Sequence, residues 1–286
     1  MNRTARILLL GGLAALLQPF LAGDGDGCAR AQGEVRTASY VPTGREVSRS
    51  VMLGMGRVSQ LDTYLSPVEY GGPQLSFLTL RERMTGMAHG HIAFQGMCQG
   101  AFSYTENPAA NANELGGRIG YDAGWHYVWQ PVRQLSLKAG GLVGTDVGFL
   151  YNTRNGNNPA QARANVDVSL SAGGSYEFHI RHLPLQMHYQ ADFPVLGCMF
   201  SPHYGESYYE IYQGYGGHYV CFTSPANALS LRQLLTLDLC FPRTTLRMGY
   251  LSDIRQSHVR GIKVHDISRS FMLGYVRRFQ TLKRKR

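Results

Sequence analysis

The strongest constraint on the fold is a stretch of strictly alternating polarity at residues 164–181. Its even positions are small, aliphatic or aromatic, and its odd positions are Asn, Asp, Ser, Gly, Glu, His or Arg. A period of two is the repeat of a β-strand, because successive side chains point to opposite faces. Strands of globular proteins usually have about 3–10 residues. So long a strand favours the wall of a transmembrane β-barrel, with lipid outside and a polar lumen inside.

The same alternation recurs in other segments of the chain. The clearest examples are residues 119–129, 185–193, 229–241 and 267–279. Trp125 and Trp129, the only two tryptophans, lie near the end of the first of these. Aromatic residues gather at the two interfaces of membrane barrels, so this position is typical of an aromatic girdle.

Short and long connections separate the alternating segments, as in bacterial barrels with short periplasmic turns and longer outer loops. The short connections are 130–133, 181–184 and 242–244. The long ones are 105–114, 152–163, 196–206 and 257–264. The expected strands are 48–58, 73–85, 90–104, 116–129, 134–150, 164–181, 184–195, 207–213, 217–224, 229–241, 245–256 and 267–279. The pair 207–213 and 217–224 is also compatible with a hairpin in an outer loop, which leaves ten strands.

We therefore predict an all-β fold, a transmembrane antiparallel up-and-down β-barrel of about 12 strands, with 10 as the alternative. A soluble β-sandwich would also alternate. The length of the strands and the Trp, Tyr and Phe on their apolar faces favour the barrel. Only 16% of residues are charged and 44% are hydrophobic, which a barrel tolerates because only alternate residues face lipid.

The first residues have the pattern of a secretory signal. Arg3 and Arg6 precede an apolar segment at 7–22, and Ala29 and Ala31 form a small-x-small cleavage site. An uncleaved anchor is the alternative. The predicted organisation is a signal peptide (1–31), a polar periplasmic or plug segment (32–47), the barrel (48–280) and a basic periplasmic tail (281–286). The predicted location is the outer membrane of a Gram-negative bacterium, after cleavage of the signal peptide.

Three motifs together resemble those of a known family. They are Leu61-Asp62-Thr63-Tyr64-Leu65-Ser66-Pro67, the segment 200–210 (FSPHYGESYYE) and Leu246-Arg247-Met248-Gly249-Tyr250. The set resembles an uncharacterised family of Bacteroidota outer-membrane β-barrels known only as a domain of unknown function. The resemblance covers about residues 48–279 and implies a location in the cell envelope. It implies no activity and no functional residue.

The polar faces of the expected strands place many charged residues in the lumen. The predicted lumen network consists of Arg118, Asp122, His126, Asp167, Glu177, His179, His188, Asp192, Arg232 and Asp238. One interpretation is a narrow, selective pore lined by charge. The other, which we favour, is a network of paired charges that fills the lumen.

A tyrosine-rich segment at residues 200–219 is the best candidate for a binding surface outside the barrel. Tyrosine is common at contact surfaces because it is large, rigid and amphipathic. The predicted ligand-binding residues in this outer loop are His203, Tyr204, Glu206, Tyr208, Tyr209 and Glu210. Their spacing matches no standard metal motif, so we predict neither a metal site nor a cofactor.

The function predicted from sequence is a narrow pore or a ligand-binding barrel. A structural subunit of an outer-membrane complex is one alternative. A lipid-acting hydrolase is the other, with Ser201 or Ser207, His203 and Asp192 as possible members of a site, but nothing marks an oxyanion hole and we predict no catalytic residue. The expected partners are outer-membrane lipids and either envelope proteins or a small polar ligand. Nucleic acid is not expected, because half of the net charge of +8 that remains without residues 1–31 lies in the last four residues.

Overall fold

The computed structural model describes residues 46–156, 158–180, 183–214, 217–241 and 244–280. The predicted signal peptide, most of the polar segment that follows it and the basic tail lie outside the described residues. No helix in the described part of the chain is long and apolar enough to cross a membrane.

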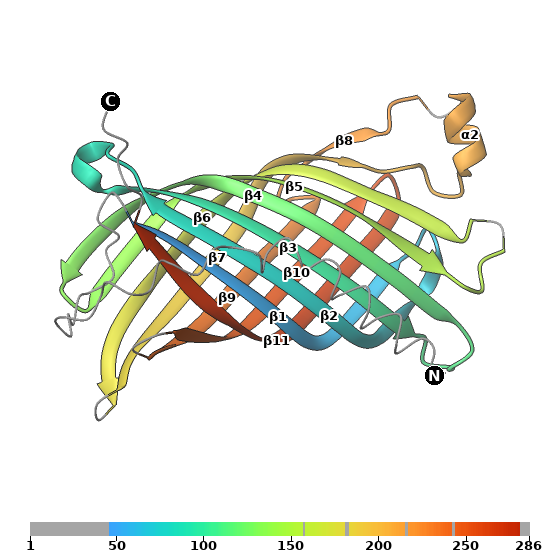
Figure 1. The fold of residues 1–286 in the computed structure, drawn as a ribbon. Helices are drawn as coiled ribbons and strands as arrows, with labels where there is room; N and C mark the ends of the chain where they lie inside the picture. The colour runs from blue at the N-terminus through green and yellow to red at the C-terminus, as the bar shows by residue number, and fades with distance from the viewer. Residues whose placement is uncertain (1–45, 157, 181–182, 215–216, 242–243, 281–286) are drawn as a thin grey trace. The chain divides into compact units, whose positions relative to one another are not determined.

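Ten long antiparallel strands form a closed barrel (Figure 1). They are β1 (Glu46–Asp62), β2 (Ser66–Met84), β3 (Ile92–Glu106), β4 (Asn113–Val132), β5 (Leu135–Asn152), β6 (Ala160–Ile180), β7 (Leu183–Phe200), β9 (Ala228–Cys240), β10 (Thr245–Val259) and β11 (Ile262–Gln280). Each strand pairs with its neighbours in sequence, and β11 pairs with β1 from Glu46↔Gln280 to Asp62↔Val264. The predicted fold class is confirmed, with ten strands in the barrel wall.

The difference from twelve strands lies between β7 and β9. Residues 207–213 were expected to form a strand, but Tyr208–Gln213 form the helix α2. Ser207 caps this helix by accepting a hydrogen bond from the Glu210 backbone, and the Glu210 side chain accepts one from the Ser207 backbone. The hydrogen bonds of this capping box stabilise the start of a helix, whereas the alternation of polarity that suggested a strand is weak here. The short strand β8 (Val220–Thr223) pairs with β7 outside the closed circuit.

The expected long loop at 257–264 is also wrong. β10 continues to Val259 and β11 begins at Ile262, so only two residues connect them. Arg260 and Gly261 both have positive φ, 52° and 78°. Two such residues make a tight turn whose twist matches that of the paired strands.

The barrel has two different ends. We call one the loop end, because it carries the connections 63–65, 107–112, 153–159, 260–261 and the long segment 201–227 with α2 and β8. The opposite end, the terminal end, holds the start of β1, the end of β11 and the connections 85–91, 133–134 and 241–244. A short 3-10 helix, η1 (Ala88–Gly90), lies in the first of these.

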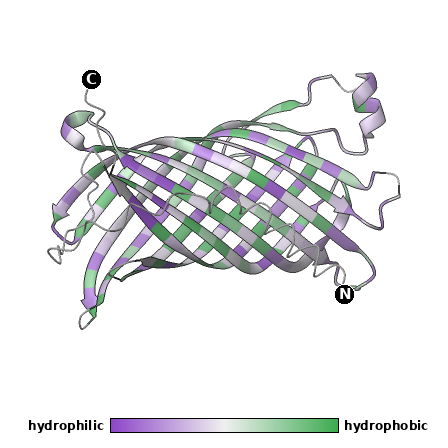
Figure 2. Cartoon of the chain, viewed as in Figure 1, coloured by the Kyte–Doolittle hydropathy of each residue, from purple (hydrophilic) through white to green (hydrophobic). Residues whose placement is uncertain are grey.

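The outer surface carries a belt of exposed apolar side chains. On β4, Ile119, Tyr121, Trp125, Tyr127 and Trp129 are 51–57% exposed. The apolar face predicted for residues 164–181 also points outward, with Leu170 exposed. Figure 2 shows hydrophobic and hydrophilic residues alternating along the strands. Large contiguous apolar surfaces are rare on soluble monomers. A belt of this kind around a closed barrel is typical of an outer-membrane β-barrel.

Part of the lumen is apolar, which differs from the polar lumen expected from sequence. Inward-facing side chains from β1, β2, β3, β9, β10 and β11 pack into one buried cluster, which we call the apolar layer. Its members are Met52, Leu78, Leu80, Met97, Leu234, Leu251 and Met272. Leu234 is an apolar residue on the polar face of residues 229–241, so the sequence indicates one member of this layer.

The seam between β1 and β11 depends on a close approach at Gly56. A Cβ atom added there would overlap the backbone carbonyl oxygen of Arg269 on β11. We therefore expect Gly56→Ala to destabilise the barrel by about 1–3 kcal/mol, because the paired backbones would have to move apart. Urea unfolding in lipid vesicles, followed by heat-modifiable gel mobility, measures this loss.

Gly86→Ala is the matched control. Gly86 lies in the β2–β3 connection, and an added Cβ there meets no atom within 4 Å. Equal unfolding midpoints for the two variants would contradict the steric explanation.

Candidate functional site

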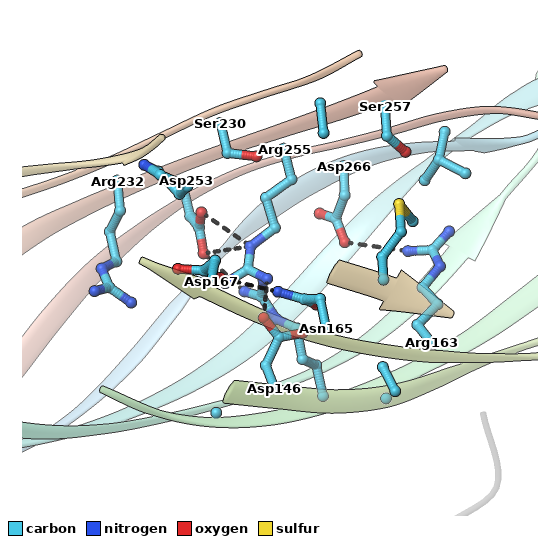
Figure 3. A pocket seen from close by; sticks show the side chains of 18 of the residues that line it. Asp146, Arg163, Asn165, Asp167, Ser230, Arg232, Asp253, Arg255, Ser257 and Asp266 are labelled. Atoms are coloured by element: carbon cyan, nitrogen blue, oxygen red, sulfur yellow. Dashed lines mark hydrogen bonds and ion pairs between the residues drawn. The ribbon is translucent and has the colours of Figure 1, made fainter. Parts of the chain in front are cut away.

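One cavity of the barrel, which we call the loop-end cavity, lies in the half of the lumen toward the loop end. It has a volume of about 170 Å³. All its charged lining residues are arginines and aspartates: Arg118, Arg163, Arg232, Arg255, Asp122, Asp146, Asp167, Asp192, Asp253 and Asp266. Figure 3 shows several of them pointing toward one another from different strands.

Alternation places these side chains in the lumen. On β6, Arg163 and Asp167 line the cavity, whereas the intervening Val166 is 52% exposed on the outer surface. On β10, Asp253 and Arg255 occupy alternate positions in the same way. Since successive residues of a strand face opposite sides of the sheet, a charged residue at every second position reaches the cavity.

Arg232 joins three strands across the lumen. Its Nη1 atom lies 2.8 Å from Asp122 Oδ2 on β4, and its Nη2 atom lies 2.9 Å from Asp192 Oδ2 on β7. All three side chains are buried. A guanidinium group suits this position because its donors form a planar fork that can bind two carboxylates at once.

A second set of ion pairs shares Asp253. Arg118 Nη2 donates to Asp253 Oδ2 at 2.8 Å, and Arg255 Nε lies 3.3 Å from Asp253 Oδ1. The Nη1 atom of Arg255 reaches Asp146 Oδ2 at 2.5 Å. Arg255 therefore lies between two carboxylates (Figure 3).

Arg163 makes the contacts nearest to the loop end. Its Nη2 atom donates to Asp62 Oδ2 at 2.8 Å, and its Nη1 atom lies 3.7 Å from Asp266 Oδ2. Asp62 also accepts a hydrogen bond from the backbone of Tyr64, which fixes the β1–β2 connection. The charge network is therefore tied to the rim of the barrel.

Negative charge exceeds positive charge in the cavity, since six aspartates and four arginines line it. Asp167 accepts hydrogen bonds from Asn165 Nδ2 at 3.0 Å and Ser169 Oγ at 2.9 Å. No basic side chain in the described segments forms an ion pair with Asp167. The cavity thus has a carboxylate whose charge is not balanced by a direct partner.

Three buried polar atoms around the cavity have no hydrogen-bond partner among the described residues. They are Arg118 Nη1, Arg163 Nε and Gln99 Oε1. A buried polar atom without a partner costs free energy, so each of these atoms is available to a water molecule or a polar solute.

The smaller cavity, of about 70 Å³, lies toward the terminal end. Lys138 Nζ forms an ion pair with Glu82 there and donates to Gln95 Oε1 at 3.0 Å. Arg247 binds Asp238 through two parallel hydrogen bonds of 2.6 and 2.7 Å. The charges in this half of the lumen are therefore paired locally.

On the side of the barrel formed by β1–β3 and β9–β11, the apolar layer lies between the two cavities. Along β9, Arg232 lines the loop-end cavity, Leu234 belongs to the apolar layer, and Thr236 lines the smaller cavity. β10 has the same order, with Leu251 in the layer. On β7, by contrast, Asp192 lines the loop-end cavity and Gln190, the next inward-facing residue, lines the smaller one.

Most of the predicted lumen network lies in the lumen. Arg118, Asp122, Asp167, Asp192 and Arg232 line the loop-end cavity, and His188 lines the smaller one. The remaining residues are His126 and Asp238, which are buried, Glu177, which is half-buried, and His179, which is exposed one residue before β6 ends.

Sequence reasoning missed several important members of the site: Asp62, Arg163, Asp253, Arg255 and Asp266. Arg163 had been assigned to a loop, and Asp62 and Asp266 lie beyond the predicted ends of their strands. The pair Asp253 and Arg255 had a usable signal, because both alternate with the outward-facing residues of the 245–256 segment.

The predicted outer-loop residues mostly hold the loop together. Glu206 accepts hydrogen bonds from Tyr219 Oη at 2.8 Å and from the His203 backbone at 3.1 Å. The Tyr208 hydroxyl accepts a hydrogen bond from the Ala162 backbone at 2.6 Å, at the barrel rim. Glu210 belongs to the helix cap. Four of the six predicted residues therefore have contacts within this end of the barrel.

Tyr64 holds the 201–227 segment against the rim of the barrel. Its hydroxyl donates to the Glu206 carbonyl at 2.6 Å, and its ring packs edge-on against Tyr208. Burial raises the pKa of Tyr64 to about 12, so the hydroxyl keeps its proton and the hydrogen bond at neutral pH. By contrast Tyr204 and Tyr209 are 68% and 70% exposed.

The residues considered for a hydrolase do not form a triad. Asp192 is buried in the lumen and bonded to Arg232, Ser171 and Gln190. Ser207 bonds to Glu210 instead of His203. Among the described residues, no group of three or more His, Cys, Asp and Glu side chains is arranged to hold a metal ion.

Removing the guanidinium group of Arg232 would leave two buried carboxylates facing each other. We expect Arg232→Met to destabilise the barrel by about 3–5 kcal/mol, the usual cost of breaking a buried ion pair on one side. Urea unfolding in lipid vesicles measures it. Arg154→Met is the control, because the Arg154 side chain donates an exposed hydrogen bond to Asn111 and forms no ion pair among the described residues. Equal midpoints for both variants would contradict a structural role for the Arg232 network.

Comparison with known proteins identifies one family and a number of similar barrels. A family model described as "Protein of unknown function (DUF3316)" matches residues 15–286. No curated protein matches the chain. Among solved structures, the chain resembles the transport unit of the autotransporter AIDA-I from Escherichia coli, with 10% identity, a TM-score of 0.47 and coverage of 95% of this chain and 96% of that one.

Two further solved structures have similar coverage. For the outer membrane protease OmpT from Escherichia coli, identity is 7%, the TM-score is 0.49 and coverage is 83% of this chain and 98% of that one. For the COG4313 outer membrane channel from Pseudomonas putida F1, the values are 9%, 0.33, 87% and 100%. The bacterial group named by the sequence resemblance and the cleavage of a signal peptide stay predictions.

Proposed function

The chain belongs to the DUF3316 family, and we propose that its barrel binds a small organic cation in the loop-end cavity. The main observation behind this proposal is the excess of acidic residues in the lining of the cavity, which contains six aspartates and four arginines. Opposite charge concentrated in a cleft with low-dielectric walls attracts a charged solute. The excess of carboxylates therefore favours a ligand with a positive charge.

The cavity also offers groups that would orient such a ligand. Asp167 has only neutral hydrogen-bond donors, Asn165 and Ser169, and would pair with an ammonium or guanidinium group. The unpaired donors of Arg118 and Arg163 would bind an acceptor on the same molecule. We expect a small cation that also carries a carboxylate or carbonyl, as basic amino acids do.

The apolar layer favours binding over passage through an open pore. It lies between the two cavities and is built from seven buried side chains. Apolar constrictions exclude water and ions from a pore. We therefore propose that a solute enters the loop-end cavity and leaves by the same route.

L-arginine and L-citrulline are a matched pair of probes, because a neutral urea replaces the guanidinium group in citrulline. We expect the purified barrel to bind arginine at least about tenfold more tightly than citrulline in isothermal titration calorimetry, a difference of about 1.4 kcal/mol. Asp167→Asn should remove most of that preference. The control is Glu69→Gln, which removes an exposed carboxylate that does not line the cavity.

Equal affinity for arginine and citrulline, or an equal loss of preference in both variants, would refute the proposed charge selectivity.

Conductance in planar bilayers distinguishes the binding barrel from a pore. We expect the wild-type barrel to give no channel events, because we propose that the apolar layer blocks the passage of ions. Leu78→Ser with Met272→Ser should wet the layer and produce small conductance steps. The control is Leu53→Ser with Leu273→Ser, two exposed residues on β1 and β11. Steady channel activity of the wild type would contradict the proposal that the lumen is closed.

A further inference from the structure

The outward-facing arginines of the barrel are confined to three adjacent strands, β2, β1 and β11. They are Arg49, Arg57, Arg81, Arg83, Arg269 and Arg277. On the described parts of the other barrel strands, each arginine or lysine lines the lumen: Arg118, Lys138, Arg163, Arg232, Arg247 and Arg255. One side of the barrel therefore has a basic outer face that the other sides lack.

Three of these arginines form a row at the terminal end. Arg49 on β1 is directly opposite Arg81 on β2 and Arg277 on β11. We call these three the terminal-end row. Arg81 and Arg277 are exposed and form no ion pair with a described acidic side chain. Arg277 lies over the ring of Tyr275, 5.3 Å from its centroid. Arg81 and Arg277 therefore place two exposed positive charges, without an acidic partner in the described segments, on either side of β1 at this end of the face.

A second set lies nearer to the loop end. Arg57 on β1 is directly opposite Arg269 on β11, and both are exposed. We call them the loop-end pair. Neither forms an ion pair with an acidic residue in the described segments. Their neighbours on the adjacent strands, Pro73 and Ser252, carry no charge.

The spacing of the two sets matches the thickness of a membrane. Arg49 and Arg57 are eight positions apart on β1, as are Arg269 and Arg277 on β11. Eight residues span roughly 26 Å of strand, and a tilt of about 40° reduces this to roughly 20 Å across the membrane. Long arginine side chains reach further outward, toward the edges of an apolar band about 25 Å tall.

The residues between the two sets face lipid. Met55 on β1 and Phe271 on β11 are 72% and 74% exposed, and Leu53 and Leu273 continue the same surface. This arrangement gives charge at both edges and hydrocarbon between them. A diacyl lipid with an anionic headgroup has the complementary chemistry.

We propose that β11, β1 and β2 form a docking surface for anionic lipids. The terminal-end row binds the phosphate of a lipid in one leaflet, and the loop-end pair binds the phosphate of a lipid in the other. Guanidinium groups suit this role because they bind phosphate oxygens bidentately. The acyl chains lie against the exposed apolar residues between the two sets. This surface is on the opposite face of the wall from the proposed solute site and is independent of it.

Lipid retention tests the docking surface. The purified full chain is reconstituted in nanodiscs of equal parts phosphatidylglycerol and phosphatidylcholine, and retained lipids are counted by native mass spectrometry. We expect phosphatidylglycerol to be retained preferentially. Arg57→Gln with Arg269→Gln should lower that preference by about tenfold, as should Arg81→Gln with Arg277→Gln. The corresponding lysine variants keep the charge and should retain an intermediate preference.

Arg133→Gln with Arg154→Gln is the matched control, since both residues lie in connections away from this face. Heat-modifiable gel mobility confirms that each variant is folded, and the single variants replace any pair that is not. Equal retention of both lipids by the wild type, or an equal effect of the control, would overturn the proposal. Displacement of the lipid by inorganic phosphate at matched ionic strength would also overturn it, because the site would then recognise phosphate without a lipid.

Discussion

The barrel depends on the pairing of its backbone. Within a bilayer, no water is available to the peptide groups of an edge strand, so a sheet that crosses the membrane must close on itself. The chain closes the sheet by pairing its first described strand, β1, along its whole length with its last strand, β11. Closure then gives every wall residue either a lipid-facing or a lumen-facing side, and the rest of the structure follows from that division.

The two faces of the barrel wall have different surroundings, lipid on the outside and the lumen on the inside. Lipid excludes most charges from the outer face, so polar residues of all ten barrel strands meet in a narrow interior. There they join segments that are distant in sequence, as Arg232 joins Asp122 and Asp192. The apolar layer occupies one side of the middle of the lumen, where buried charges would need partners of their own. It lies between two cavities that differ in their charged residues.

The sequence predicted the elements whose pattern is local. Residues 164–181 correspond closely to β6 at 160–180, because lipid on one face enforces a strict period of two. The helix at 208–213 was missed, although Ser207 and Glu210 have the spacing of a capping box, since the alternation of the segment suggested a strand. The partners across the lumen could not be deduced. Which residues meet there depends on the stagger of ten strands, and no short segment contains that information.

The position of the basic outer face on the wall has a consequence for assembly. Arg49 and Arg277, and likewise Arg57 and Arg269, belong to the first and the last strand, so neither pair exists until the sheet has closed. Electrostatic repulsion between them acts against the final step of folding, and nearby anions relieve it. The closing seam is therefore the part of the barrel whose formation is most sensitive to the charge of the surrounding membrane.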